Sequence, residues 1–365
     1  MGGRKLAVAF IGVEPELSWA AVAHIPALRA MTDRFVIAGL ANTSPESSRR
    51  AAAACGIERA FDSVDALVGD PAVDIVAVTV KVPAHLALVS KALDAGKHVY
   101  CEWPLGNGLA EAEALAEQAR RAGVCAMIGT QARQSPAVLK ARELVASGYV
   151  GEVLSSTIVG SGLGWGAMTD QRNAYTSDVA TGASMLTIPF GHTMAAVTDV
   201  LGPLTRVSGL LETRRKRIAL REDGREIDQT APDQVLVMGQ FANGVPLSVH
   251  YRGGMPADLG FVWEINGSDG YLKFTGQHGN AQMVALELQG AHGSDRELRP
   301  IELDRARPFA GLGSLAENVA NLYSGLYEAI TTDAPASPSF DDAVQLHRLI
   351  AAIEKSAASG CSVTL

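Results

Sequence analysis

The first third of the chain alternates short apolar runs with stretches of helical periodicity. The apolar runs lie at residues 6–11, 35–41, 74–80, 98–101 and 125–129. Helical patterns follow them at residues 20–31, 45–55, 63–68, 83–95 and 108–122. Strands that are apolar on both faces and alternate with helices form parallel sheets, because each parallel crossover needs a covering helix. The pattern therefore predicts an α/β fold with a doubly wound parallel sheet.

The pattern changes after a further helical stretch at residues 136–147. From residue 153 to residue 274 the apolar runs are longer, richer in Thr, Ser and Val, and partly alternating. Clusters of Gly, Asn and Asp at residues 242–244 and 267–270 separate several runs, which is typical of hairpins. We therefore expect a large, mostly antiparallel sheet in this part of the chain.

A sheet of this width needs both faces covered. The helical stretch at residues 185–201 is expected to cover one face. A bare apolar face on the other side usually meets a partner, so a homodimer or homotetramer formed through this sheet is predicted. Residues 315–331 and 340–359 return to helix.

The length of 365 residues is too great for one small core. We expect a first domain over residues 1–149 and a sheet domain over residues 150–310. The helices within residues 311–365 are expected to pack back on the body of the protein.

Composition excludes several classes of function. The net charge of −8 disfavours direct nucleic-acid binding, which needs a basic surface. No apolar run reaches the ~18 residues of a membrane span. The four cysteines are scattered, which is typical of free thiols in the cytoplasm. The eight histidines form no metal-binding spacing, so no metal is expected.

The turn after the first strand is the place for a phosphate site. It keeps one glycine, Gly12, of the G-x-G-x-x-G pattern that brings backbone N–H groups close to a pyrophosphate. Gly12, Val13, Ser18 and Trp19 are the predicted cofactor contacts. The carboxylates of Glu14 and Glu16 would repel phosphate if they pointed inward.

The end of the second strand offers Asn42 and Thr43 where NAD-binding proteins place a carboxylate for the ribose. Arg49 follows about one helical turn later. An uncharged ribose pocket with a nearby arginine tolerates a 2′-phosphate, so NADP is slightly favoured over NAD. Alternatively, Arg49 and its neighbour Arg50 only solvate a helix face.

Three segments resemble one known family in sequence, and they also follow one another in the order and spacing of that family. They are AHIPAL at residues 23–28, ALDAGKHVYCEWPL at residues 92–105 and GASMLTIPFGHTMAAVTDVLG at residues 182–202. Together they resemble the glucose–fructose oxidoreductase / inositol dehydrogenase / rhizopine catabolism (Gfo/Idh/MocA) family over nearly the whole chain. The resemblance implies an N-terminal Rossmann domain, a C-terminal α+β domain with an open-faced sheet, and a nicotinamide dinucleotide between them.

One branch of that family is matched more narrowly. The Glu102-Trp103-Pro104 tripeptide, the segment from Val80 to His85 and the Ser18-Trp19 pair resemble the branch that contains the fungal galactose-regulon repressor. The resemblance therefore implies two classes of function, an enzyme or a regulator.

The family's catalytic groups are only partly present. By resemblance, Trp103 stands at the position of the catalytic lysine and Ile188 at that of the assisting aspartate, while His192 matches the proton-accepting histidine. His192 is either the surviving base or a histidine kept for packing. Trp103 either stacks on the cofactor and lines the sugar pocket, or fills the space of the lysine chain.

Lys81 is a candidate replacement for the missing lysine. It follows the apolar run at residues 74–80, and strand ends in such a sheet open onto the same crevice. It could instead contact the cofactor ribose or a surface carboxylate. The other predicted contacts to the cofactor are Val80, His85, Glu102, Trp103 and Gln131.

The predicted contacts to substrate lie around the domain junction. Arg133 follows the last strand of the first domain, and Tyr175 and Asp178 lie in a long loop before His192. The leading hypothesis is an NAD(P)-dependent oxidoreductase that acts on a sugar or polyol derivative, with His192 as acid/base. The alternative is a non-catalytic dinucleotide-binding regulator or metabolite sensor.

Overall fold

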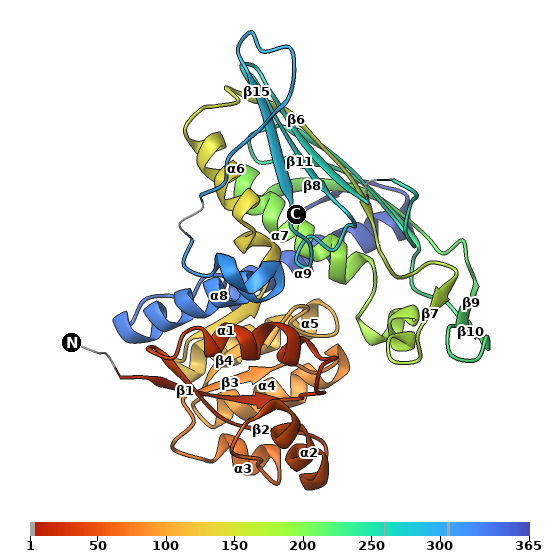
Figure 1. The fold of residues 1–365 in the computed structure, drawn as a ribbon. Coiled ribbons are helices and arrows are strands. Elements are labelled where there is room, and N and C mark those ends of the chain that lie inside the picture. The colour runs from red at the N-terminus through yellow and green to blue at the C-terminus, as the bar shows by residue number, and fades with distance from the viewer. Residues whose placement is uncertain (1–3, 259, 305–306) are drawn as a thin grey trace. The chain divides into compact units, whose positions relative to one another are not determined.

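The computed structural model describes residues 4–258, 260–304 and 307–365. The chain forms two compact units. The first lies within residues 1–131 and 307–345, and the second lies within residues 132–306 and 346–365. Figure 1 labels many of the elements, and its colour follows the residue number along the chain.

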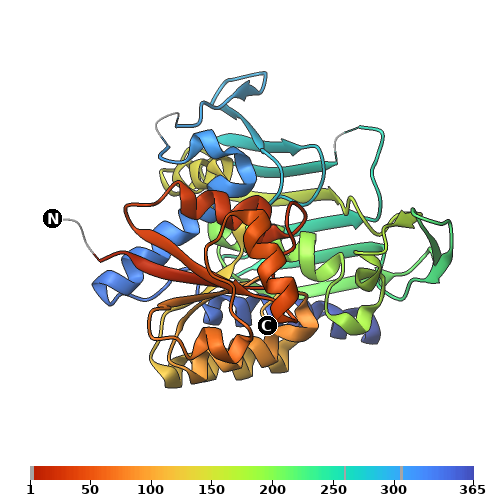
Figure 2. The same cartoon turned by 60° about the horizontal axis from the view of Figure 1, so that its bottom comes forward.

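The first unit contains a five-stranded parallel sheet of order β2-β1-β3-β4-β5. Its strands are β1 (Leu6–Ile11), β2 (Phe35–Ala41), β3 (Ile75–Val78), β4 (His98–Glu102) and β5 (Ala126–Gly129). Helices cover both faces (Figure 2). They include α2 (Pro45–Cys55), α3 (Val64–Val68), α4 (His85–Asp94) and α5 (Leu109–Ala122). The predicted doubly wound sheet is confirmed.

Strand order reverses between β1 and β3, since the chain runs from β1 outward to β2 and then returns to the other side of β1. In open α/β sheets ligands bind outside the carboxyl ends of the strands at such a point. The strand predicted at residues 74–80 leaves the sheet at Val78. The backbone N–H of Thr79 still donates to Ile11 O, but its hydroxyl turns to the Gly12 carbonyl.

A helix from late in the chain completes the core of the first unit. Helix α8 (Gly313–Thr332) packs against the segment that follows β1. Its buried face supplies Val319, Leu322 and Tyr323 to the same apolar cluster as Phe10. This unit therefore has a core assembled from distant parts of the sequence.

The helix predicted at residues 20–31 opens with a π-helical turn, η1 (Ala20–His24), and continues as α1 (Ile25–Arg29). A second π-helical turn, η6 (Leu186–Phe190), opens the helix predicted at residues 185–201. Pro26 and Pro189 lie in or directly after these turns. A proline has no N–H, so it removes one α-type hydrogen bond and favours the wider turn.

The second unit contains a nine-stranded sheet of order β16-β15-β14-β13-β6-β12-β11-β8-β17. Its strands are β6 (Val153–Ser161), β8 (Leu204–Glu212), β11 (Gln234–Phe241), β12 (Pro246–Arg252), β13 (Phe261–Gly267), β14 (Gly270–Gly276), β15 (Glu287–His292), β16 (Arg299–Pro300) and β17 (Val363–Thr364). Pairing is antiparallel except between β12 and β6. The large, mostly antiparallel sheet and both predicted hairpins are confirmed.

A small three-stranded sheet was not predicted. It joins β7 (Met168–Thr169), β9 (Arg217–Leu220) and β10 (Glu226–Asp228). The basic run before β9 is held by the buried carboxylate of Asp233, which accepts from the backbone N–H groups of Arg214 and Arg215. These strands are too short to show a period in the sequence.

Helices α6 (Pro136–Ala146), α7 (Gly191–Leu201) and the end of α9 (Phe340–Ser359) belong to the second unit. In α9, Ser356 Oγ accepts from the N–H of Gly209 on β8 at 2.9 Å. Other side chains of the sheet stay exposed, namely Leu210, Leu236 and Met238 on adjacent strands.

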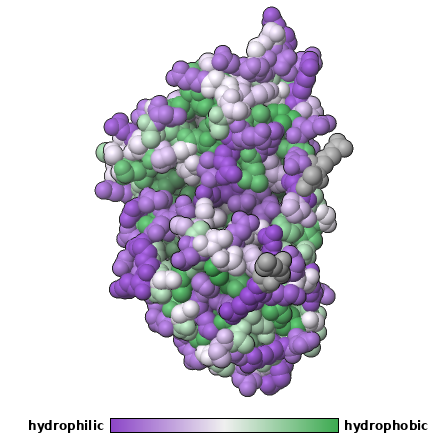
Figure 3. Space-filling model, turned by 90° about the vertical axis from the view of Figure 1, so that its left-hand side faces the viewer, coloured by the Kyte–Doolittle hydropathy of each residue, from purple (hydrophilic) through white to green (hydrophobic). Residues whose placement is uncertain are grey.

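The surface mixes residue types. On the side that Figure 3 displays, hydrophilic and hydrophobic residues are interspersed. Among the described residues, no helix has the length and apolar character needed to cross a membrane.

Candidate functional site

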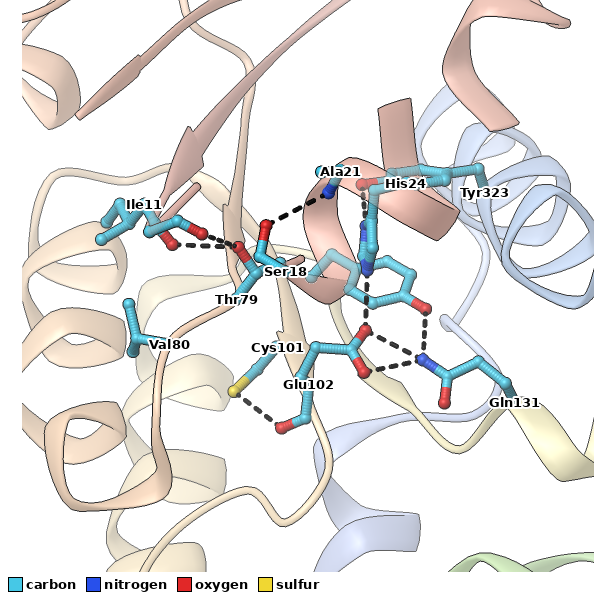
Figure 4. Close-up of polar contacts among 12 residues, drawn as sticks. Ile11, Ser18, Ala21, His24, Thr79, Val80, Cys101, Glu102, Gln131 and Tyr323 are labelled. Carbon is cyan, nitrogen blue, oxygen red and sulfur yellow. Dashed lines mark hydrogen bonds and ion pairs between the residues drawn. The ribbon is translucent and has the colours of Figure 1, made fainter. Parts of the chain in front are cut away.

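The turn after β1 depends on Gly12. Its φ is +90°, and a Cβ added there would lie 2.3 Å from Val80 Cγ1. Thr79 fastens this approach, because its hydroxyl donates to the carbonyls of Ile11 at 3.1 Å and Gly12 at 2.8 Å (Figure 4). The structure thus brings together two of the predicted cofactor contacts, Gly12 and Val80.

Asn42, at the end of β2, turns its side chain into the same turn. Its Oδ1 accepts from the Val13 N–H at 2.8 Å, and its Nδ2 donates to the Val13 carbonyl at 2.9 Å. Both polar atoms of the amide are therefore engaged with backbone. Asn42 fixes the turn, and its neighbour Thr43 is exposed.

Ser18 satisfies the other end of the turn. Its hydroxyl accepts from the Glu14 N–H at 3.0 Å and donates to the Glu14 carbonyl at 2.8 Å. It also accepts from the Ala21 N–H at 3.3 Å, as an N-cap does. The N–H groups of Gly12, Val13 and Glu14 are thus all bonded within the protein. Glu14 is exposed.

A buried polar network lies beside the end of β4. Glu102 Oε1 lies 2.8 Å from His24 Nε2, and His24 Nδ1 lies 2.9 Å from the hydroxyl of Tyr323 on α8. Gln131 Nε2, just beyond β5, donates to both oxygens of Glu102 at 2.9 and 2.8 Å. Figure 4 shows these groups directed toward one another. Sequence reasoning missed His24 and Tyr323.

The chemistry of this network follows from its end groups. A carboxylate oxygen only accepts, so His24 donates to Glu102 through its Nε2–H. In the neutral tautomer that carries this proton, Nδ1 accepts from the Tyr323 hydroxyl. Burial, and then the charge of Glu102, raise the pKa of Tyr323 well above its usual value. Tyr323 therefore stays a hydrogen-bond donor. Two side-chain oxygens nearby, Gln131 Oε1 and Thr130 Oγ1, are buried with no hydrogen-bond partner.

Trp103 directly follows β4, His85 lies in the segment after β3, and both side chains are buried. Trp103 is 5% exposed, and His85 is 1% exposed. The ring nitrogens of His85 lie 2.8 Å from Pro104 O and 3.0 Å from Val80 O. Burial lowers the pKa of His85, although these carbonyls oppose the shift. His85 thus fastens the segment after β3 to the segment after β4.

The basic candidates of the first unit lie at its surface. Lys81 is exposed and precedes a short 3₁₀ turn, η2 (Val82–Ala84). Arg49 lies on α2 and forms an exposed ion pair with Asp62 at 3.2 Å. The two basic groups therefore follow different strands, β3 and β2.

In the second unit, His192 is the second residue of α7 and is 3% exposed. Its Nδ1 is buried and has no hydrogen-bond partner. Burial lowers the pKa of His192 to about 3, so the imidazole is neutral at physiological pH. An unpaired buried nitrogen costs free energy unless a ligand or water bonds to it.

The next residue ties this helix to the sheet. The Thr193 hydroxyl lies 2.6 Å from the hydroxyl of Tyr251 on β12, and Tyr251 donates to the Gly279 carbonyl at 2.9 Å. The Tyr251 ring packs edge-on against Phe190 and over Gly160, where a Cβ would lie 2.4 Å from the ring. The start of α7 therefore has a fixed place on the sheet.

The predicted substrate contacts of the second unit have structural partners. Arg133 Nη2 pairs with Asp199 Oδ1 on α7 at 2.7 Å. Asp178 caps a 3₁₀ turn by accepting from the Ala180 N–H at 3.0 Å. Burial raises the pKa of Tyr175. Among the residues that the structure describes, no cluster of His, Cys, Asp and Glu could hold a metal.

Comparison with known proteins decides the family. A model of the oxidoreductase family with an NAD-binding Rossmann fold matches residues 6–130. A model of the Gal80p C-terminal domain matches residues 136–276. The dehydrogenase aclE of Aspergillus oryzae is 31% identical over 90% of this chain and 89% of its own. The chain belongs to the Gfo/Idh/MocA family.

Two further comparisons extend the likeness. The galactose/lactose metabolism regulatory protein GAL80 of Saccharomyces cerevisiae is 26% identical over 98% of this chain and 94% of its own. A crystal structure of a super-repressor mutant of Gal80p superimposes with a TM-score of 0.91, at 25% identity over 99% of this chain and 98% of that one. The resemblance to the branch with the galactose-regulon repressor is confirmed.

Proposed function

We propose that this protein is a nicotinamide-dinucleotide-dependent oxidoreductase that acts on a sugar or polyol derivative. The observation that supports it best is the unpaired, buried Nδ1 of the neutral His192, which offers a hydrogen bond to a ligand hydroxyl. Levoglucosan dehydrogenase of Pseudarthrobacter phenanthrenivorans, a sugar-derivative enzyme by name, is 25% identical over 87% of this chain.

The residues around the parallel sheet suit a dinucleotide in part. When bound, such a cofactor supplies hydride acceptance or donation. Trp19 Nε1 and Gln131 Oε1 are buried without partners, so they offer one donor and one acceptor to a ligand. The first N–H groups of the turn are already bonded, which predicts weaker phosphate binding than a turn with three glycines would give.

We assign His192 to orienting the ligand hydroxyl at Nδ1. A base whose conjugate acid has a pKa of about 3 accepts protons poorly at neutral pH, so transfer of the ligand hydroxyl proton needs a further group. We propose that Lys81 supplies an ammonium donor in place of the family lysine, whose position Trp103 occupies: in the reduction direction it gives its proton to the carbonyl oxygen as hydride arrives, and in the oxidation direction the resulting amine takes the hydroxyl proton back. Lys81→Met would then lower kcat far more than Lys81→Arg.

Cofactor choice and assembly are part of the proposal. Because Asn42 faces Val13, we propose that Thr43 and Arg49 meet the adenosine ribose, with a slight preference for NADP.

The exposed Leu210, Leu236 and Met238 on neighbouring strands support a homodimer or homotetramer formed through the large sheet.

The second candidate is a non-catalytic dinucleotide-binding regulator. It is favoured by Trp103, which is buried at the family's lysine position, and by Ile188 at the position of its aspartate. The likeness to GAL80 over almost the whole chain also supports it. Loss of two of three proton-handling groups would cost much of the ~10²–10⁴-fold that such groups contribute.

One experiment separates the two candidates. Purified protein is titrated with NADH and with NADPH by fluorescence, and then screened with sugars and polyols for a change at the nicotinamide absorbance band. Turnover that falls at least tenfold in His192→Ala, but not in the exposed-surface control Gln277→Ala, supports the oxidoreductase. Cofactor binding without turnover across the panel supports the regulator. If neither nucleotide binds, both candidates are wrong.

A further inference from the structure

A second buried polar side chain in the unit of His192 has an unused hydrogen-bonding atom. Gln282, between β14 and β15, is 4% exposed, and its Oε1 is buried with no hydrogen-bond partner. Its Nε2 lies 3.4 Å from Oδ1 of Asn280, which is 5% exposed. Asn280 Nδ2 donates in turn to the Gly162 carbonyl at 3.0 Å.

The direction of this chain is fixed by its last member. A backbone carbonyl can only accept, so the Asn280 atom that meets Gly162 must be the amide nitrogen. Asn280 Oδ1 is then the atom that faces Gln282, and it accepts from Gln282 Nε2. Flipping either amide would bring two acceptors or two donors together. Gln282 is therefore left with its acceptor unused.

The hydrogen bonds that run from Gln282 through Asn280 to Gly162 are connected to the residues around His192. The carbonyl of Gly279, next to Asn280, accepts from Tyr251, whose hydroxyl meets Thr193 beside His192. At the other end, a Cβ added to Gly162 would lie 2.9 Å from the sulfur of Met185, at the start of the helical stretch that leads to His192. Two independent links therefore join the Gln282 segment to this stretch.

Both unused atoms suit the same kind of ligand. A hydroxyl group can donate and accept, so it matches Gln282 Oε1 and also His192 Nδ1 in either neutral tautomer. A carboxylate or phosphate oxygen matches Oε1 poorly, because both are acceptors. A ligand with several hydroxyls offers a partner suited to each of the two atoms, and a buried atom left unsatisfied costs about 1–3 kcal/mol.

We propose that Gln282 is a specificity-determining residue that accepts a hydrogen bond from a hydroxyl group of a sugar or polyol, while His192 holds a second hydroxyl of the same molecule. This inference deepens the proposed function, and it rests on that function for the class of ligand. Asn280 is a positioning residue, since it orients the Gln282 amide.

The test measures sugar binding rather than turnover, so it also applies if the protein is a regulator. D-Glucose, myo-inositol, sorbitol and levoglucosan are titrated by calorimetry into the NADH-saturated protein and into Gln282→Met. We expect the Kd of the tightest sugar to rise about tenfold, which is one hydrogen bond of ~1.4 kcal/mol. The Kd for NADH should not change. Gln277→Met, the same change at an exposed position of the segment, should leave both constants unchanged.

Monodeoxy derivatives of the tightest sugar identify the hydroxyl. One derivative should lose affinity for the wild-type protein, yet bind equally to wild type and Gln282→Met. If Gln282→Met does not fold, Gln282→Asn, which withdraws the amide by one methylene, is used in its place with the same expectation. A sugar Kd that stays within twofold in the folded variant overturns the proposal and leaves the oxidoreductase intact. Absence of any sugar binding to the wild type overturns both the inference and the sugar class.

Discussion

The side-chain amide of Asn42 binds both backbone polar groups of Val13, at 2.8 and 2.9 Å. An aspartate at position 42 could accept from the Val13 N–H, but it could not donate to the Val13 carbonyl. Asn42→Asp should therefore lower the free energy of unfolding by about 1–3 kcal/mol, measured by urea denaturation. It should not increase the preference for NADH over NADPH, since the side chain faces the turn.

The matched variant is Thr43→Asp, one residue later and exposed. It should unfold like the wild type and shift the preference toward NADH. A gain in NADH preference from Asn42→Asp with no loss of stability would contradict this account of the turn.

Gly12 leaves no room for a side chain. Gly12→Ala places a methyl group 2.3 Å from Val80 Cγ1 at a φ of +90°. The clash and the left-handed backbone together should cost about 2–4 kcal/mol of unfolding free energy. In the Gly12→Ala/Val80→Ala double variant, part of that cost should be recovered, which a double-mutant cycle measures. Additive effects of the two changes would show that the two side chains do not meet.

The His24–Glu102 pair should contribute more to stability than ion pairs at the surface. Glu102→Leu leaves the fully buried His24 Nε2–H without its acceptor, so we expect a loss of about 1–3 kcal/mol in thermal or urea unfolding. Glu102→Gln keeps an acceptor and should cost about 1 kcal/mol.

The control for that prediction is Asp65→Asn, which breaks an exposed pair with Lys91 and should cost at most ~1 kcal/mol. Equal losses in Glu102→Leu and Asp65→Asn would mean that the buried network does not stabilise the first unit.

His192 makes stability depend on pH. Its pKa is about 3 when folded, below the usual value of 6.5. Below pH 6.5 the unfolded state takes up a proton that the folded state does not, so stability is full above pH 6.5 and falls as pH decreases toward 3. At pH 5 the loss from this group should be roughly 2 kcal/mol.

His192→Gln should remove that dependence, so its unfolding free energy should change less between pH 7 and pH 5 than that of the wild type. His250→Gln is the comparison, because the His250 side chain is only partly buried. Parallel pH curves for wild type and His192→Gln would mean that the folded His192 takes up a proton as readily as the unfolded chain.

Much of the fold was predictable because its local rules agree. Ser44 and Pro45 indicate where the helix at residues 45–55 begins, and the structure has Ser44 as the N-cap and the same bounds. The apolar runs indicate most strands of the five-stranded and nine-stranded sheets, because the side chains of these runs are buried in the fold. The π-helical turns at η1 and η6 were not predicted, since apolar periodicity does not distinguish the wider turn from an α-helix.

The candidate site was less predictable, because its polar partners are distant in sequence. The sequence around His24 does not indicate that its partners are Glu102 and Tyr323, and Tyr323 lies 299 residues away. A histidine inside an apolar segment was the available clue. Likewise Asn42 was predicted to contact the cofactor, and only the geometry shows its bonds to Val13. Gln282 lies in a segment with no motif at all.

The position of helix α8 late in the sequence affects how the protein folds during its synthesis. The residues that complete the first core lie beyond residue 306, after eight of the nine strands of the large sheet have been synthesised. A nascent chain that has emerged only to Gln131 lacks Tyr323 and the apolar face of α8, so His24 has no hydroxyl to meet. Contacts this far apart in sequence form late and slow folding. The unit whose strands are synthesised first is therefore expected to complete its core only once α8 has emerged.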